Sequence, residues 1–300
     1  MVRGPMSPKT MPNSVESTRA LLKCGKYLSD EGLGTSLYLS LKLGRPLLIE
    51  GRSGVGKSEV ASVLAEQLQR PLIRLQCHEG LDVSAAVYEW NYAQQMIEIR
   101  LAESAEGRGK DAVAANIFSE RFLVKRPILQ ALETKVGSGA PVLLIDEIDR
   151  ADEGFEAYLL EVLSDFQVSV PELGTFRAEE RPITILTSNR TREIQDALKR
   201  RCIYYWIDYP SAAREAEILK LHTPGMSRRF TEDLDALVQE LRSREFRGDP
   251  WVTAEAKWAA TLMEMDRQEL DPKRTSAKIA EMVKRNQQQV YDENKLEASP

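Results

Sequence analysis

Short apolar runs alternate along this chain with longer segments in which apolar residues recur every three or four positions. The runs are Pro46–Glu50 (PLLIE), Leu72–Cys77 (LIRLQC), Val142–Ile145 (VLLI) and Ile183–Asn189 (ITILTSN). Pro46–Glu50 and Val142–Ile145 are typical of strands buried on both faces of a parallel sheet, and the other two runs are typical of further strands. Val60, Leu64 and Leu68 form the apolar stripe of a helix that ends before Pro71, and FEAYLLEVL and the region around Ile128–Val136 are also helical in pattern.

This alternation of strands and helices predicts an α/β core with a parallel sheet between two layers of helices. Beyond Pro210 the pattern changes, because the remaining segments have helical spacing and no strand-like run separates them. We therefore expect an α/β domain over 21–210 and an all-helical domain over 211–290. The polar ends, 1–20 and 291–300, are expected to be flexible.

Composition narrows the class of protein. The chain has 300 residues, 42% of them hydrophobic, and a formal net charge of −5, which gives no general reason to expect nucleic acid as a ligand. Its three cysteines, Cys24, Cys77 and Cys202, are too few and too dispersed for a disulfide framework or a thiolate metal cage. No run approaches the roughly 20 apolar residues of a membrane span. We expect a cytoplasmic protein.

One loop carries a specific chemical signal. After the first apolar run and before the Val60 helix, the sequence fits the phosphate-loop pattern G-x-x-x-x-G-K-[ST], as Gly51-Arg52-Ser53-Gly54-Val55-Gly56-Lys57-Ser58. Glycines let backbone N–H groups surround phosphate oxygens, and the following helix directs its positive end at the same anion. The motif predicts that Lys57 contacts the β- and γ-phosphates of ATP and that Ser58 holds Mg²⁺. The alternative is an ordinary strand-to-helix turn.

Two adjacent acids end the third apolar run, in VLLIDE. Asp146 and Glu147 would lie at the carboxyl edge of the sheet, where open α/β sheets bind their ligands. With a phosphate loop in the same chain, we expect Asp146 to hold Mg²⁺ and Glu147 to orient and polarise an attacking water. Without that loop, two acids after an apolar run would indicate only a strand end.

Three further residues are weaker candidates. Asn189 ends the fourth run at the same expected edge, where it could bind the γ-phosphate or the attacking water; capping a turn is its alternative role. Lys199, Arg200 and Arg201 are three consecutive cations, which usually form a solvated face. An arginine supplied to a neighbouring subunit can instead stabilise phosphoryl transfer, and Arg201 is preferred over Arg200 for that part.

The order of these motifs, followed by a helical region, resembles the AAA+ ATPases, whose P-loop core carries a helical lid. The segment from about Tyr88 to Lys125 and the segment FQVSVPELGTFRAEERP resemble the helix-2 insert and pre-sensor hairpin of the MoxR branch, and DEIDRAD is similar to its DEINRA. LIRLQCHEGLDVSAAVYEWNY and TSNRTREIQDALKRRCIYYWIDYP look like the CoxD-type members, which mature carbon monoxide dehydrogenase and related molybdenum hydroxylases.

The resemblance implies a hexameric ring of identical subunits and a partner with a von Willebrand factor A domain. It also implies a remodelled protein client, here a molybdenum hydroxylase. One departure concerns the lid, where the family's sensor arginine has only Lys257 in the matching region. In the insert, Trp90, Tyr92 and Met96 are candidates for client contact or for core packing, as is Leu173 at the hairpin tip.

Two other functions compete with an ATP-driven remodelling enzyme. The first is a scaffold whose binding surface switches with bound nucleotide and which hydrolyses ATP too slowly to do work. The second is a DNA-acting motor, suggested only by the basic residues around Arg190 and Lys199. Phosphate contacts would make DNA binding steeply dependent on salt, so a salt series separates this last hypothesis from the others.

Overall fold

A computed structural model describes residues 10–104, 117–133 and 139–211, with 213–214, 217–218 and 221. The chain divides into two compact units, Met1–Arg52 with Gly56–Asp208, and Ser53–Val55 with Tyr209–Pro300. The helical domain expected over 211–290, with Lys257, and the tail 291–300 fall almost wholly outside the described residues.

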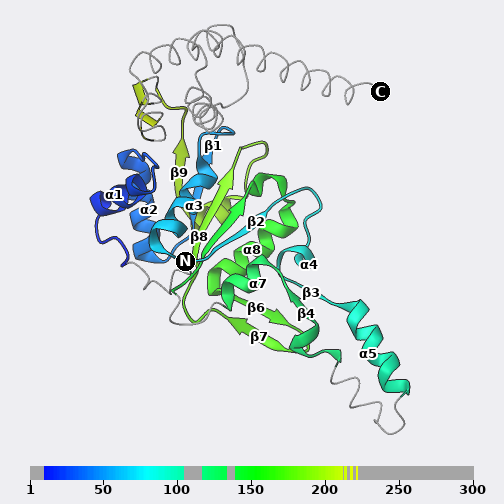
Figure 1. Cartoon of the computed structure of the whole chain (residues 1–300). Helices are drawn as coiled ribbons and strands as arrows, with labels where there is room; N and C mark the ends of the chain where they lie inside the picture. The colour runs from blue at the N-terminus through cyan, green and yellow to red at the C-terminus, as the bar shows by residue number, and fades with distance from the viewer. Residues whose placement is uncertain are drawn as a thin grey trace, which may run out of the picture. The chain divides into compact units, whose positions relative to one another are not determined.

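The first unit is built on a five-stranded parallel sheet in the order β2-β5-β8-β1-β9 (Figure 1). Its strands are β1 Leu47–Gly51, β2 Leu72–Gln76, β5 Val142–Asp146, β8 Ile183–Ser188 and β9 Ile203–Ile207. The predicted α/β class is confirmed. Four of the strands are the apolar runs of the sequence, and the fifth, β9, forms one edge of the sheet beside β1.

Helices cover both faces of this sheet because successive strand residues point in opposite directions. Leu48, Leu143 and Ile145 belong to one buried cluster, with side chains of α7 (Pro127–Leu132) and α8 (Glu153–Asp165). Leu47, Ile49 and Leu144 belong to a second cluster. The helices of that second cluster are α1 (Val15–Cys24), α2 (Glu31–Leu43) and α3 (Lys57–Leu68).

Helix α1 begins inside the segment 1–20 that the sequence predicts to be flexible. Ser14 caps it: its Oγ accepts a hydrogen bond from the Ser17 backbone N–H at 3.1 Å, and the Ser17 hydroxyl accepts one from the Ser14 N–H. Leu22 is fully buried in the cluster with α2 and α3, which anchors the helix to the core. Cys24, the last residue of α1, has an exposed thiol.

Two antiparallel pairs of strands lie outside the main sheet. β3 (Tyr88–Trp90) pairs with β4 (Leu123–Lys125) at the base of the expected insert, with α4 (Val83–Ala86), α5 (Tyr92–Ser104) and the short 3-10 helix η1 (Glu120–Phe122) close to it in sequence. The expected hairpin is formed by β6 (Gln167–Val170) and β7 (Gly174–Arg177).

The apolar residues of the insert and the hairpin tip divide between packing and exposure. Trp90 is buried and meets Phe118 edge-on, with 5.5 Å between ring centroids. Leu173 packs partly buried against the core cluster that includes α8. Tyr92 and Met96 on α5 are exposed. Core packing therefore explains Trp90 and Leu173 and leaves Tyr92 and Met96 without a packing role.

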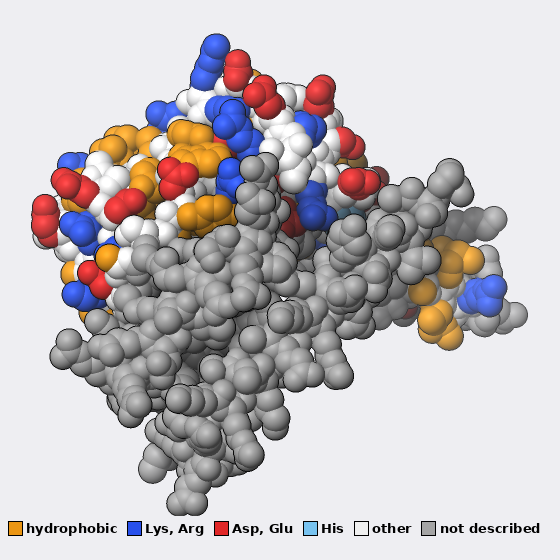
Figure 2. Space-filling view, turned by 90° about the horizontal axis from the view of Figure 1, so that it is seen from above, with side chains coloured by type: hydrophobic (Ala, Val, Ile, Leu, Met, Phe, Trp, Pro, Cys, Tyr) orange, Lys and Arg blue, Asp and Glu red, His pale blue; other side chains and the backbone are white. Residues whose placement is uncertain are grey.

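Charges of both signs are mixed on the surface. On the described part of the face shown in Figure 2, Lys and Arg side chains alternate with Asp and Glu side chains. This mixture agrees with the small net charge of −5. Within the described residues, every helix is too short or too polar to cross a bilayer.

Candidate active site

The phosphate-loop motif connects β1 to α3 at the carboxyl edge of the sheet. Gly54 and Gly56 have φ angles of 74° and 90°, in the left-handed region that a residue without Cβ adopts at little cost. Lys57, the first residue of α3, folds back over the loop. Its Nζ donates to the carbonyl oxygens of Gly51 at 2.9 Å and Arg52 at 2.6 Å. The carbonyl groups of the loop thus hold the lysine side chain in place.

The Lys57 ammonium is buried close to several carboxylates. Burial lowers the pKa of Lys57, and the charges of Asp149, Asp146 and Glu147 oppose that shift. The side chain is 6% exposed, so a phosphate would meet a cation that is already largely desolvated. Such a cation has less hydration to lose on binding an anion.

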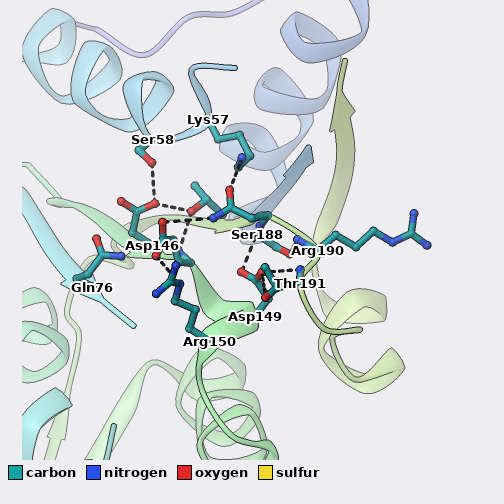
Figure 3. A network of polar contacts seen from close by, with 12 residues as sticks. Lys57, Ser58, Gln76, Asp146, Asp149, Arg150, Ser188, Arg190 and Thr191 are labelled. Atoms are coloured by element: carbon teal, nitrogen blue, oxygen red, sulfur yellow. Dashed lines mark hydrogen bonds and ion pairs between the residues drawn. The ribbon is translucent and has the colours of Figure 1, made fainter. Parts of the chain in front are cut away.

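Asp146 ends β5 with a buried carboxylate. Its Oδ1 accepts from the Ser58 hydroxyl at 2.6 Å (Figure 3). The same oxygen accepts from the Thr187 hydroxyl, and Oδ2 pairs with the Arg74 guanidinium. A serine hydroxyl and a carboxylate side by side are the hard oxygen donors that Mg²⁺ prefers. Among the described residues, no group of three His, Cys, Asp or Glu side chains could hold a metal alone. The Ser58–Asp146 pair therefore fits a Mg²⁺ ion whose other ligands are phosphate oxygens and waters.

Glu147 follows Asp146 with a left-handed backbone, φ 56° and ψ 49°. Its N–H donates to the Thr187 hydroxyl at 3.0 Å, which fixes this turn of the chain to β8. One carboxylate oxygen, Oε1, accepts from the Asn189 side-chain amide at 3.3 Å. The other, Oε2, pairs with the Arg150 Nε at 3.0 Å. Both oxygens are therefore engaged within the protein.

Asn189 links the two motifs. Its Oδ1 accepts from the Lys57 ammonium at 2.8 Å, while its Nδ2 donates to Glu147. The chain thus brings together Lys57, Ser58, Asp146, Glu147 and Asn189, all predicted site residues, at one edge of the sheet.

The two candidate arginines lie elsewhere. Arg200 and Arg201 end the short helix α9 (Asp196–Arg201), and both are exposed. The Arg45 guanidinium donates to the backbone carbonyls of both residues, at 3.0 Å to Arg201, and so holds the end of the helix. The Arg201 side chain donates to the Leu160 carbonyl at 3.4 Å. Neither arginine bonds to the Lys57–Asn189–Glu147 group within the described residues.

Four polar residues of the site were not identified from the sequence. Thr187 bonds to both Asp146 and Glu147, Arg74 pairs with Asp146, and Arg150 pairs with Glu147. Asp149 accepts hydrogen bonds from the segment after β8. Thr187, on β8, precedes Asn189 by two positions, and Asp149 and Arg150 stand within the acidic motif, so proximity in sequence was the available signal. Arg74 had no such signal.

Residues 46–202 match the family model of the AAA domain, dynein-related subfamily, and this match covers more than half of the chain. The chain belongs to this AAA family. The matched segment contains four of the five strands of the sheet, all but β9, along with the loop, both acids and Asn189.

Curated relatives of this AAA protein include two gas vesicle ATPases. The GvpN of Haloferax mediterranei is 28% identical over 217 residues, which cover 68% of this chain and 58% of that protein. GvpN1 of Halobacterium salinarum is 28% identical with the same coverage. The chain thus spans 58% of the length of these relatives. The AAA family and the names of the relatives support ATPase activity, with nucleotide binding, at the level of the family.

A crystal structure from Cytophaga hutchinsonii also matches this AAA protein, at 16% identity and a TM-score of 0.45. That match covers 69% of this chain and 56% of the other. A likeness of that degree carries no weight for function.

Proposed function

We propose that this AAA protein hydrolyses ATP with Mg²⁺ and uses the cycle to remodel a protein client. The observation that carries the proposal is the single bonded group Lys57–Asn189–Glu147, next to the Ser58–Asp146 pair, at the carboxyl edge of the sheet. Cation, acid and metal-type oxygen donors are thereby held within one hydrogen-bonded site, as phosphoryl transfer to water requires.

In the proposed reaction, Lys57 exchanges its carbonyl partners for phosphate oxygens of ATP. Ser58 and Asp146 would hold Mg²⁺, which when bound supplies positive charge to those oxygens. Glu147 would release one of its protein partners, then orient a water and polarise its O–H bond for attack on the γ-phosphorus. As the new P–O bond forms, the bond from the γ-phosphorus to the bridging oxygen breaks, ADP leaves with that oxygen, and the proton of the water passes to the carboxylate or to the released phosphate. Asn189, freed from Lys57, would bind the γ-phosphate or the same water. Each step uses a group that this chain already positions.

Assembly and client complete the proposal. Arg200 and Arg201 are exposed and separate from the bonded group, as an arginine that acts on a neighbouring subunit would be. We propose a homo-hexameric ring with Arg201 as that arginine. The resemblance to CoxD-type proteins favours a molybdenum hydroxylase client and a von Willebrand factor A partner in the cytoplasm. The gas vesicle relatives favour a client among gas vesicle proteins instead.

Replacing Glu147 tests the proposal directly. The Glu147→Gln variant keeps the shape of the side chain and its contact with Asn189, so it should bind ATP with nearly unchanged affinity. Its hydrolysis rate should fall by a factor of about a hundred or more, because the amide cannot polarise water. Calorimetry with ATP and a phosphate-release assay measure the two quantities. Undiminished turnover in this variant would refute the assigned role.

The same variant identifies the client. A protein held in its ATP-bound state should retain its client through a pull-down, and mass spectrometry would then distinguish a molybdenum hydroxylase from a gas vesicle protein. Lys57→Ala is the matched control, because it removes the phosphate contact and should bind neither ATP nor client. Equal recovery of the same protein with both variants would argue against nucleotide-dependent remodelling.

A nucleotide-gated scaffold is the second candidate function. It is favoured by one observation: both oxygens of Glu147 are engaged, one by Asn189 and the other by Arg150. If this arrangement persisted with ATP bound, hydrolysis would be slow and ATP would act mainly as a switch. Turnover that no partner accelerates, combined with ATP-dependent capture of a partner, would favour the scaffold over the remodelling enzyme.

A further inference from the structure

Asp149 is a buried acid whose charge the proposed reaction does not use. Its side chain is 3% exposed, and it belongs to η2 (Ile148–Arg150), the short 3-10 helix after Glu147. Oδ1 accepts from the Asn189 N–H at 3.2 Å. Oδ2 accepts from the Thr191 N–H at 2.9 Å and the Thr191 hydroxyl at 2.7 Å. These three donors all belong to the segment directly after β8, as Figure 3 shows for Thr191.

These bonds hold that segment in an unfavourable backbone shape. Arg190, between the two residues that bond to Asp149, has a φ of 58°, in the left-handed region that residues with a Cβ seldom adopt. Such a conformation persists only where its surroundings impose it. Here the two neighbouring N–H groups are fixed on one carboxylate, and the Ser188 hydroxyl accepts from the Arg190 N–H at 3.0 Å. The direction in which the chain leaves β8 is thereby set.

The direction of the chain at this point decides where the Asn189 amide lies. That amide bridges the Lys57 ammonium and the Glu147 carboxylate, with hydrogen bonds of 2.8 and 3.3 Å. The backbone of Asn189 is bonded to Asp149, and its side chain is bonded to Lys57 and Glu147. A shift of the Asn189 backbone would therefore displace its side-chain amide. A misplacement of about 1 Å at a reacting group can lower a rate by a factor of about a hundred.

We infer that Asp149 is a positioning residue for ATP hydrolysis, which acts by holding Asn189 in register with Lys57 and Glu147. The inference rests on the proposed function. A carboxylate suits this task because it offers only acceptor oxygens to three donors, whereas an amide would turn one donor group toward them. The negative charge of Asp149 also lies near Lys57, where it favours the charged ammonium.

The test is a double-mutant cycle with Asp149→Ala, Asn189→Ala and the two changes combined. Asp149→Ala should lower kcat by a factor of about a hundred, while KM and the Kd for ATP change less than about threefold. If Asp149 acts through Asn189, the double variant should be no slower than Asn189→Ala alone, within about a factor of two. If Asp149 only stabilised the fold, its replacement would lower kcat of the double variant further, below that of Asn189→Ala alone.

Two conservative variants keep the test valid if Asp149→Ala folds poorly. Asp149→Asn retains one acceptor oxygen and should fall between wild type and Asp149→Ala in kcat. Thr191→Val removes one hydroxyl bond and leaves both backbone bonds, so kcat should stay within about tenfold of wild type. Far-UV circular dichroism and the melting temperature of each variant confirm that the comparison is between folded proteins.

Separate outcomes overturn the two proposals. If Asn189→Ala is slow but Asp149→Ala and Asp149→Asn turn over normally, the inference about Asp149 fails and the proposed function stands. Losses that multiply in the double variant also overturn the inference, because the two residues would then act independently. If Asn189→Ala hydrolyses ATP normally, both the predicted role of Asn189 and the positioning role of Asp149 fail.

Discussion

At the scale of single residues, the site is a set of acids with distinct partners. Asp146 pairs with Arg74 and Glu147 with Arg150. Asp149 instead accepts hydrogen bonds from the N–H groups of Asn189 and Thr191 and from the Thr191 hydroxyl. A triphosphate would bring more negative charge to this edge of the sheet. The side chains of Arg74 and Arg150 are more than half exposed and can therefore move. Their guanidinium groups can then turn toward the negative charge of a bound triphosphate.

Buried thiols give a residue-scale prediction for alkaline pH. Burial raises the pKa of Cys202 from 9.0 to about 12, so the folded protein keeps this thiol protonated where the unfolded chain ionises it. The resulting stability is fully present below pH 9.0 and is lost as pH rises toward 12. Between about pH 8 and about pH 10, the free energy of unfolding of the wild type should fall by about 1 kcal/mol more than that of Cys202→Ala.

Urea denaturation of both proteins at the two pH values measures this loss. Other titrating groups are common to wild type and Cys202→Ala, so their contributions cancel in the difference. An equal change of unfolding free energy in the two proteins would show that Cys202 ionises as freely in the fold as in the unfolded chain.

At the scale of elements, the residues of α2 differ in burial and should therefore differ in their contribution to stability. Leu37 is fully buried against the sheet, whereas Leu43, in the last turn, is 55% exposed. Leu37→Ala should lower the free energy of unfolding by about 3 kcal/mol, because it leaves a cavity in a packed cluster. Leu43→Ala is the matched control and should change it by less than about 0.5 kcal/mol. Similar urea midpoints for the two variants would contradict this packing of α2.

The strands that could be predicted from the sequence are those whose own residues form a recognisable apolar run. The runs at β1, β5 and β8 are mostly apolar because these strands are buried in the sheet. The phosphate loop and the acids lie at the ends of β1 and β5, where the pattern of the runs locates them. β9, IYYWI, was not predicted as a strand, since an edge strand with partly exposed aromatic residues lacks a fully apolar run. The bonds of Asp149 and Arg74 join residues far apart in the sequence, so only the fold could reveal them.

At the scale of the whole molecule, the exposed arginines at the end of α9 give a prediction for assembly. Arg201→Ala and Lys57→Ala should each abolish most hydrolysis, since an arginine acting on phosphoryl transfer is worth about a thousandfold or more. An equal mixture should recover roughly a quarter of wild-type turnover, because one interface in four joins an intact phosphate loop to an intact arginine.

Substituting Arg200→Ala for Arg201→Ala in the mixture decides between the two arginines. Size-exclusion chromatography with light scattering confirms that the variants still assemble and exchange subunits. A mixture that assembles but shows no recovery with either arginine would argue against action across an interface. The assignment would move to Arg200 if Arg200→Ala is inactive by itself and regains activity in the mixture, while Arg201→Ala is active by itself.

The uneven exposure of the cysteines gives this protein a built-in attachment point for a probe. At neutral pH a thiol with a pKa of about 12 is ionised to only about one part in a hundred thousand, so Cys77 and Cys202 will resist maleimide reagents. Cys24 is exposed and should accept a single fluorophore. Energy transfer between labelled subunits can then test the proposed ring and its subunit exchange without any engineered cysteine.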